Sequence, residues 1–161
     1  MEFELNKKLI DLGYRVLKPK EKDFEKFYEI KKINCEKYVK QFFSIWDEAE
    51  QREYNYKVFQ ESLKQDYFKK VILNNNLVGF LSFSIFEKEI GCVTIQILNH
   101  KTREIIIDWF LNALIDLSGK TNKPIYLKTF IGNKDLVLFE KYGFKVFSIN
   151  NSHNLLVRKI I

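Results

Sequence analysis

The side chains that most often act as nucleophiles, bases or metal ligands are few and widely spaced in this chain. It has two histidines, His100 and His153, and two cysteines, Cys35 and Cys92, which form no Cys-x-x-Cys pair. It contains no Ser/His/Asp pattern, no cluster with metal-ligand spacing and no Gly-x-x-x-x-Gly-Lys phosphate loop. Hydrolase, kinase and metalloenzyme chemistry therefore lack support, and the cysteine usage favours a reducing, cytoplasmic setting.

The most informative stretch runs from Asn133 to Phe144, between apolar runs at 125–130 and 146–149. This order predicts a strand, a short helix at 134–142, a glycine turn and a second strand, because Gly143 can adopt the left-handed backbone that follows a helix end. The stretch resembles the C-terminal motif of the GCN5-related N-acetyltransferases (the GNAT family), which runs roughly Asn-x-x-Ala-x-x-Leu-Tyr-x-Lys-x-Gly-Phe. The matching residues are Asn133, Leu138, Lys141, Gly143 and Phe144, and the departures are Leu136 and Phe139.

Two further stretches carry the same resemblance. Trp46 to Gln51 is similar to a Trp-Asp-Glu-x-x-Gln signature of one branch of small family members, and His153 to Lys159 is similar to their closing strand. The resemblance extends along nearly the whole chain. It implies an acyltransferase that moves an acetyl group from acetyl-CoA to a small-molecule amine or a protein amino group, by direct attack of the amine and without a metal.

The resemblance also implies where acetyl-CoA would bind. In the family, a strand leads into a Gln/Arg-x-x-Gly-x-Gly/Ala loop that opens a helix, whose backbone N–H groups and dipole hold the pyrophosphate. That loop corresponds here to residues 102–107, with Ile105 and Ile107 in place of the glycines, and Lys101 and Arg103 as compensating phosphate partners. The cofactor-binding residues implied are Ile97, Leu98, Lys101, Thr102, Arg103, Glu104, Ile105, Ile106, Ile107, Asn133 and Phe139.

Within this set, a backbone N–H near Ile97 or Leu98 would polarise the thioester carbonyl. Asn133 would contact the pantetheine arm, or would simply cap a helix, which asparagine does well. The missing glycines leave an alternative open. The chain would then be a non-catalytic ligand-binding or regulatory module of the same fold that has lost efficient coenzyme A binding.

Acetyl transfer to an amine needs a general base, often acting through water. Glu48 is our candidate because it lies in the matched signature, with Glu87 and Glu89 as alternatives; a solvated helix residue is the plainer interpretation of Glu48. Trp46 and Gln51 would line the acceptor pocket, although a buried tryptophan more often belongs to the core.

The departing thiolate is usually protonated by a family tyrosine, and Phe139 stands in its place. Tyr142 lies about one helical turn further on and is the substitute acid that the sequence offers. A thiol also ionises near a pKa of ~8.5, so a thiolate can leave without an acid.

Hydrophobic periodicity predicts the elements that position these residues. A short helix opens the chain, Asp23 caps a helix from Phe24, a second helix covers about 42–63, and the strongest helix covers 102–117 and is ended by Gly119. The expected strands are 14–17, 68–73, 77–86, 92–98, 125–130, 145–149 and 155–160, with 74–76 as a tight turn. This order predicts one acetyltransferase-like domain over residues 1–161, of the α/β class, GNAT-like, with a mixed, mostly antiparallel central sheet and helices on both faces.

The composition sets limits on partners. The net charge is +6, from 27 basic and 21 acidic residues that are scattered rather than gathered in one block. Nucleic acid is therefore an unlikely partner, and an anionic cofactor would be served equally well. No apolar run approaches the ~20 residues that span a bilayer, so we expect a soluble, cytoplasmic protein. A homodimer is possible, since many relatives pair through their C-terminal strands.

Overall fold

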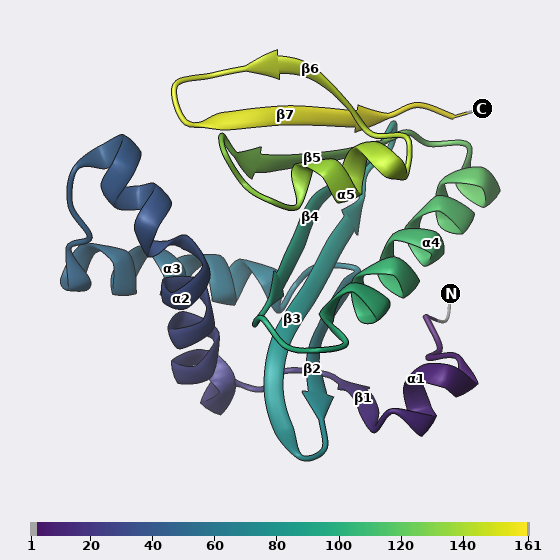
Figure 1. The fold of residues 1–161 in the computed structure, drawn as a ribbon, viewed down its shortest axis with the longest axis horizontal. Coiled ribbons are helices and arrows are strands. Elements are labelled where there is room, and N and C mark those ends of the chain that lie inside the picture. The colour runs from purple at the N-terminus through teal and green to yellow at the C-terminus, as the bar shows by residue number, and fades with distance from the viewer. Residues whose placement is uncertain (1–2, 161) are drawn as a thin grey trace.

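A seven-stranded mixed sheet forms the centre of the computed structural model, which describes residues 3–160 (Figure 1). The strands lie in the order β1-β2-β3-β4-β5-β7-β6, and every neighbouring pair is antiparallel except β4 and β5. Their bounds are β1 Tyr14–Leu17, β2 Tyr67–Leu73, β3 Asn76–Ile85, β4 Ile90–Ile97, β5 Ile125–Phe130, β6 Lys145–Ile149 and β7 His153–Arg158.

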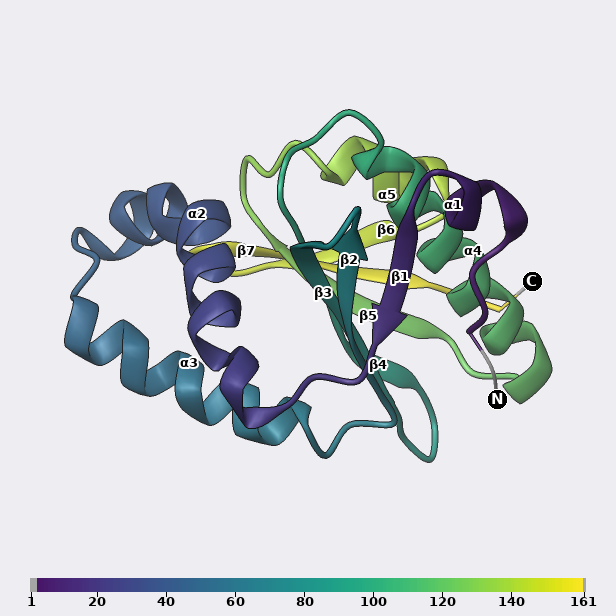
Figure 2. The same ribbon diagram turned by 90° about the horizontal axis from the view of Figure 1, so that it is seen from below.

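Helices cover both faces of this sheet (Figure 2). One face carries α2 Phe24–Phe43, which follows the 3-10 turn η1 Glu21–Asp23, and α3 Glu48–Ser62. The other face carries α1 Lys7–Asp11, α4 Arg103–Thr121 and α5 Leu136–Lys141. The expected fold class, a mostly antiparallel sheet with helices on both faces, is confirmed.

Two apolar clusters hold these layers together. Phe83 and Phe110 belong to the cluster between the sheet and α4, and Phe27, Phe59 and Phe80 belong to the cluster between the sheet and the α2–α3 pair. All five side chains are fully buried, and each contributes about 1.5–3 kcal/mol relative to an exposed position. The phenylalanine-rich composition thus supplies a separate core for each face.

Local sequence signals set two of the turns as expected. Asn74 and Asn75 adopt positive φ angles of 49° and 68° in the β2–β3 turn, which asparagine tolerates better than most residues. Gly143 follows α5 with a φ of 89°, as the sequence predicted for the glycine past a helix end.

Two helix boundaries differ from expectation. Phe42 and Phe43 end α2 rather than begin α3, and the break between the helices falls at Ser44, which has a φ of 72°. Gly119 does not end α4, which continues to Thr121; Asn122 instead takes the left-handed position, with a φ of 54°, and donates its N–H to the Ser118 carbonyl. Among the described helices, none combines the length and the apolar content that crossing a membrane requires.

Candidate active site

The parallel strands β4 and β5 pair at a single point, where Ile90 lies opposite Ile125. Next to this pair, the Ile90 N–H donates to the Pro124 carbonyl at 2.9 Å. From there the two strands diverge toward their C-terminal ends, and α4 begins shortly after the open end of β4 (Figure 1). The resulting gap, which we call the β4–β5 opening, interrupts the hydrogen-bond ladder in the middle of the sheet.

The backbone of Ile97 faces this opening. Gly79 of β3 lies opposite Ile97, and the next residue, Leu98, donates its N–H to the Val78 carbonyl at 2.8 Å. Bonded and non-bonded positions alternate along an antiparallel pair, so the N–H and C=O of Ile97 point away from β3 and toward β5. Ile97 therefore presents an open strand edge inside the gap.

Arg103 spans the mouth of the opening. Its Nε donates to the Ile97 carbonyl at 3.1 Å, and its Nη1 and Nη2 donate to the two carboxylate oxygens of Asp135 at 2.9 and 2.7 Å. The Arg103 and Asp135 side chains are only 12% and 14% exposed. A second bridge joins the same two loops, since Lys134 Nζ donates to Asn99 Oδ1 at 2.6 Å.

We call these four residues, Arg103, Asp135, Lys134 and Asn99, the clasp. The guanidinium that the sequence offered as a free phosphate partner is thus already paired inside the protein. Lys101, the other expected phosphate partner, is exposed beside the start of α4.

The loop that leads into α4 is fixed by three hydrogen-bonded side chains. Tyr14 Oη lies 2.6 Å from Thr102 Oγ1 and 2.5 Å from His100 Nε2, and His100 Nδ1 lies 2.8 Å from the Leu98 carbonyl oxygen. A carbonyl only accepts, so His100 carries its proton on Nδ1 and Nε2 accepts from the Tyr14 hydroxyl. Burial raises the pKa of Tyr14, which keeps that hydroxyl protonated as this bond requires. His100 therefore has a structural role at the loop.

The isoleucines that replace the family glycines point largely into the core. Ile106 and Ile107 are fully buried, and Ile105 is partly buried against the same apolar cluster, while Glu104 is exposed. In the first turn, the Arg103 N–H donates to the His100 carbonyl and the Ile105 N–H donates to the Thr102 carbonyl. The substitutions therefore add core packing beneath the helix start.

Three residues of the C-terminal motif, Asn133, Phe139 and Tyr142, have partners within the protein. Asn133 Oδ1 accepts from the Asp135 N–H at 2.8 Å, so this side chain stabilises the turn into α5. Phe139 is buried against Phe144 and has no proton to give. Tyr142 donates its hydroxyl to Asp108 at 2.6 Å, and burial together with this bond raises the pKa of Tyr142 to about 12. The Tyr142 hydroxyl that we expected to protonate the thiolate therefore donates instead to Asp108, which lies on α4.

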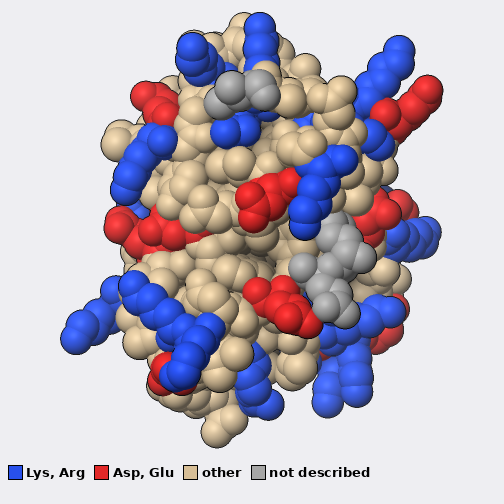
Figure 3. Space-filling model, turned by 90° about the vertical axis from the view of Figure 1, so that its right-hand side faces the viewer, with Lys and Arg blue, Asp and Glu red and all other residues tan. Residues whose placement is uncertain are grey.

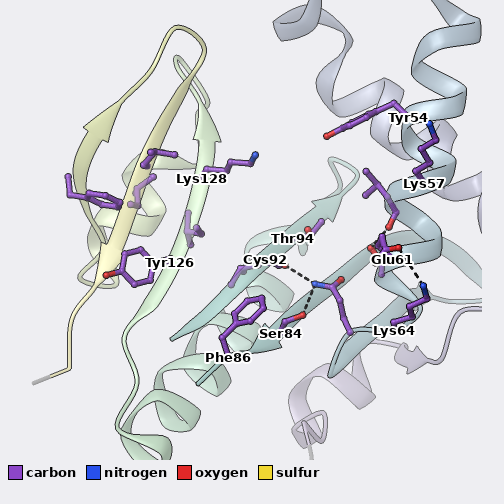
Figure 4. Close-up of a pocket in the computed structure, with 18 residues that line it drawn as sticks. Tyr54, Lys57, Glu61, Lys64, Ser84, Phe86, Cys92, Thr94, Tyr126 and Lys128 are labelled. Atoms are coloured by element: carbon purple, nitrogen blue, oxygen red, sulfur yellow. Dashed lines mark hydrogen bonds and ion pairs between the residues drawn. The ribbon is translucent and has the colours of Figure 1, made fainter. Parts of the chain in front are cut away.

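A cavity of about 830 Å³ lies on the other face of the sheet, between α3 and the strands (Figure 4). Its floor is formed by β4 and β5, on both sides of the β4–β5 opening, and α3 forms the facing wall. We call this cavity the α3 groove; its lining includes Tyr54, Lys57, Val58, Glu61, Lys64, Ser84, Phe86, Cys92, Thr94, Tyr126, Lys128, Phe147 and Leu155.

Cys92 marks an irregularity in the floor of the α3 groove. It has a φ of 50°, and the β3–β4 register shifts beside it, between Ser82 and Ser84. Gln65 fixes this bulge by donating to the Cys92 carbonyl and to Ser84 Oγ, each at 3.2 Å. Bulges of this kind redirect backbone and side chains next to functional sites.

The Trp-Asp-Glu-x-x-Gln stretch lies outside the residues that line the α3 groove. The Glu48 carboxylate accepts hydrogen bonds from Lys32 and from the Tyr28 hydroxyl, and these bonds lower the pKa of Glu48. Trp46 is buried and donates to Tyr28 Oη at 3.3 Å. Gln51 is half-buried in the second turn of α3. The stretch therefore ties α2 to α3, and the plainer interpretation of Trp46 as a core residue is the one that the structure supports.

Glu61, which no sequence motif marks, is the acidic residue that lines the α3 groove; Glu87 and Glu89 are not among its lining residues. A signal was present, because Tyr54, Val58 and Glu61 recur at the spacing of one helical face. What the sequence did not contain was the information that this face overlooks a gap in the sheet.

No protein-family model and no curated protein matches this chain. Solved structures do match its fold. The PaiA N-acetyltransferase from Thermoplasma acidophilum, in complex with coenzyme A, gives a TM-score of 0.66 at 16% identity, over 92% of this chain and 99% of that chain. Arabidopsis thaliana Naa50, in complex with the bisubstrate analogue CoA-Ac-MVNAL, gives 0.61 at 16% identity with the same coverage. The Campylobacter jejuni N-acetyltransferase PseH gives 0.55 at 11% identity, again over 92% and 99% of the two chains.

Proposed function

We propose that this chain, which has the fold of the GCN5-related N-acetyltransferases, transfers an acetyl group from acetyl-CoA to a primary amine. The observation that carries the proposal is the β4–β5 opening, where the strands pair only at Ile90 and Ile125. The clasp and the start of α4 lie at the mouth of this opening, and the α3 groove is lined by the same two strands on the opposite face. A cofactor and an acceptor that enter from opposite faces would meet at the opening, as direct transfer requires.

The residues at the opening suit the chemistry of coenzyme A. The open strand edge at Ile97 offers its N–H to an extended amide arm, while the Ile97 carbonyl already accepts from Arg103 Nε. The N-terminal end of α4 attracts phosphate, and the Arg103 guanidinium binds phosphate oxygens in the same forked manner as it binds Asp135. Diphosphate would thus compete with Asp135 for Arg103.

The protein's own groups would divide the work of transfer as follows. Acetyl-CoA supplies the thioester. The Ile97 N–H would orient and polarise its carbonyl, as preorganised donors do at acyl-transfer centres. Glu61, on the wall of the α3 groove, would accept the ammonium proton of the acceptor through water. The second proton, which the nitrogen loses as the C–S bond breaks and the amide forms, would pass to the departing thiolate and give the coenzyme A thiol. No acid is assigned to the leaving thiolate, because Phe139 carries no proton and Asp108 holds that of Tyr142.

The test is calorimetric titration of the purified protein with acetyl-CoA. We expect binding in the micromolar range. Arg103→Ala should weaken it by about 10-fold or more, since a hydrogen bond to a charged group contributes about 1.5–3 kcal/mol. Asp135→Asn should strengthen it, because a competing carboxylate is removed while the side-chain shape is kept.

Asp11→Asn is the matched control, since Asp11 forms an exposed ion pair with Lys7 on α1. It changes the net charge by the same amount and should leave the affinity as it is. Absence of binding to both the natural chain and Asp135→Asn would overturn the proposed function and favour a non-catalytic module. Unchanged affinity in Arg103→Ala would remove only the phosphate role of Arg103.

A further inference from the structure

The walls of the α3 groove carry large aromatic side chains that are exposed to the cavity rather than buried. Tyr54 of α3, Phe86 after β3 and Phe147 of β6 are 59%, 44% and 54% exposed. Tyr126 packs edge-on against Phe147, with ring centroids 5.7 Å apart. Exposed aromatic surface of this kind is uncommon unless a partner covers it. With a volume of about 830 Å³, the groove has the size of a small-molecule site.

The charged residues of the α3 groove are mostly basic. Lys57, Lys64 and Lys128 line it, and Glu61 is the acidic side chain among the lining residues. Lys64 is paired with Glu61 at 3.5 Å, and Lys57 is paired with Glu53 at 3.2 Å. Lys128 forms no ion pair with any residue in the range 3–160.

Lys128 is also well placed to receive an anion. It projects from β5 on the same face as Tyr126, and Figure 4 shows its side chain extending from the strand toward the α3 side of the cavity. An unpaired ammonium beside aromatic surface attracts a group with a negative charge and an apolar body. The same charges repel polyamines and other polycations, which need several carboxylates.

We infer that the acceptor is a primary amine on an aromatic or large aliphatic body that also carries a carboxylate, and that Lys128 pairs with that carboxylate. This inference rests on the proposed function, because it takes the α3 groove as the acceptor site. A free amino acid and the N-terminal residue of an acidic peptide share this chemistry.

The experiment compares four amines as probes. L-Phenylalanine has an aromatic body and a carboxylate, phenethylamine lacks the carboxylate, spermidine is a polycation, and the amidated peptide Phe-Asp-Ala represents a protein N-terminus. Binding is measured by saturation-transfer NMR without acetyl-CoA, and kcat/KM is measured with it. L-Phenylalanine or the peptide should exceed phenethylamine about fivefold, the upper range for an exposed ion pair, and spermidine should be the poorest.

Three groove variants assign the effect. Lys128→Met should remove the preference for the carboxylate, so that L-phenylalanine and phenethylamine have similar kcat/KM values, and Phe147→Ala should raise KM for every aromatic probe. Lys8→Glu, on exposed α1 and outside the groove, is the control for Lys128→Glu, which should reverse the preference. A higher kcat/KM with L-phenylalanine would indicate a free amino acid as acceptor, and a higher kcat/KM with the peptide would indicate a protein N-terminus.

Failure of the inference and failure of the proposed function give different results. Turnover with spermidine as the best acceptor, or a carboxylate preference that survives Lys128→Met, would overturn the inference about the acceptor. The proposed acetyltransferase function would still stand. If the probes bound in a manner that depends on Lys128 but acetyl-CoA did not bind, the inferred ligand chemistry would stand and the proposed transferase function would be wrong.

Discussion

At the scale of single residues, two carboxylates compete for the role of base. Glu48 is held by Lys32 and Tyr28, which lower its pKa and engage its oxygens. Glu61 lines the α3 groove and has only an exposed pairing with Lys64 at 3.5 Å. Position in the groove therefore favours Glu61, although Glu48 had the better sequence argument.

We predict that Glu61→Gln lowers kcat by about 10²-fold, the lower range for loss of a general base. The deficit should shrink as pH approaches the pKa of the acceptor amine, because an already neutral amine needs no base. Glu48→Gln and Glu53→Gln should keep near-natural turnover, and the Glu48 variant should lose some thermal stability. Initial rates at saturating acetyl-CoA between pH 6 and 10 provide the measurement. If Glu61→Gln and the natural chain had equal rates at every pH, Glu61 could not be the base.

Tyr142 permits a test by pH. Its pKa is raised from 10.0 to about 12 in the folded protein, so folding favours the neutral hydroxyl that donates to Asp108. A raised pKa contributes stability that is fully present below about pH 10 and is lost as the pH rises through 12. Denaturant titrations should therefore show that the stability gap between the natural chain and Tyr142→Phe narrows over this range. A gap that stays constant would contradict the raised pKa of Tyr142, whereas loss of turnover in Tyr142→Phe at neutral pH would point to a catalytic role.

At the scale of elements, the approach of β3 to β4 sets the position of Ile97. Gly79 lies opposite Ile97, and a Cβ at Gly79 would lie 2.9 Å from the Ile97 Cα and against the Gln96 carbonyl oxygen. These are backbone atoms, which do not yield as a flexible side chain does. The missing side chain of Gly79 thus allows β4 to lie where its edge faces the β4–β5 opening.

We predict that Gly79→Ala destabilises the fold by roughly 1–3 kcal/mol and weakens acetyl-CoA binding, because β4 must shift. Gly119→Ala is the control. Among residues 3–160, and apart from its chain neighbours and its own helix backbone, no atom lies within 4 Å of a Cβ there. Gly119 is inside α4, so alanine should stabilise by about 0.5–1 kcal/mol. Chemical denaturation and calorimetry check both variants. Natural affinity in Gly79→Ala would show that the position of Ile97 does not control the cofactor.

The sequence predicted most of these elements but not how two of them separate. Strand periodicity located β5 and β6 at their observed bounds, and the asparagine turn fixed the β2–β3 hairpin. The α2–α3 break was misplaced because Phe42 and Phe43 are as apolar as an inner helix face, and no glycine or proline marks Ser44. The β4–β5 opening depends on which strand edges find partners, and that is a property of the assembled sheet.

The candidate site likewise has some features that the sequence predicted and others that it could not predict. Gly143 was predictable because only its backbone conformation was at issue. The clasp was not, because Arg103 and Asp135 lie 32 residues apart and their bond depends on how two loops meet across the opening. The exposure of Lys128 into a groove likewise follows from packing rather than from local spacing.

At the scale of the whole molecule, basic and acidic side chains alternate. On the face that carries α4, lysines and arginines are spread around the rim, and acidic residues lie among and inside them (Figure 3). The net charge of +6 therefore gives a weak general attraction for polyanions rather than a single basic patch on this face. The stabilisation that a specifically bound cofactor gives must therefore exceed the stabilisation that any polyanion gives.

We predict that acetyl-CoA at 100 times its Kd stabilises the fold by about 2.7 kcal/mol. For a chain of 161 residues that corresponds to a rise in Tm of roughly 5–11 °C. Inorganic pyrophosphate at the same concentration is the control for net charge and should shift Tm far less. Equal shifts from the two ligands would mean that the protein responds to anions in general.

The single pairing between Ile90 and Ile125 also divides the chain into two parts along its length. The described elements before β5 belong to one side of this seam, and β5, α5, β6 and β7 belong to the other. Side-chain packing and side-chain hydrogen bonds, rather than a backbone ladder, join the two sides. A chain cut after Asn122 should therefore reassemble from two separately made fragments, the shorter of which is too small to fold alone. Recovery of the near-ultraviolet circular dichroism of the intact chain on mixing would demonstrate this, whereas fragments that stay unfolded together would show that covalent continuity across the seam is required. A protein built this way lends itself to use as a split reporter.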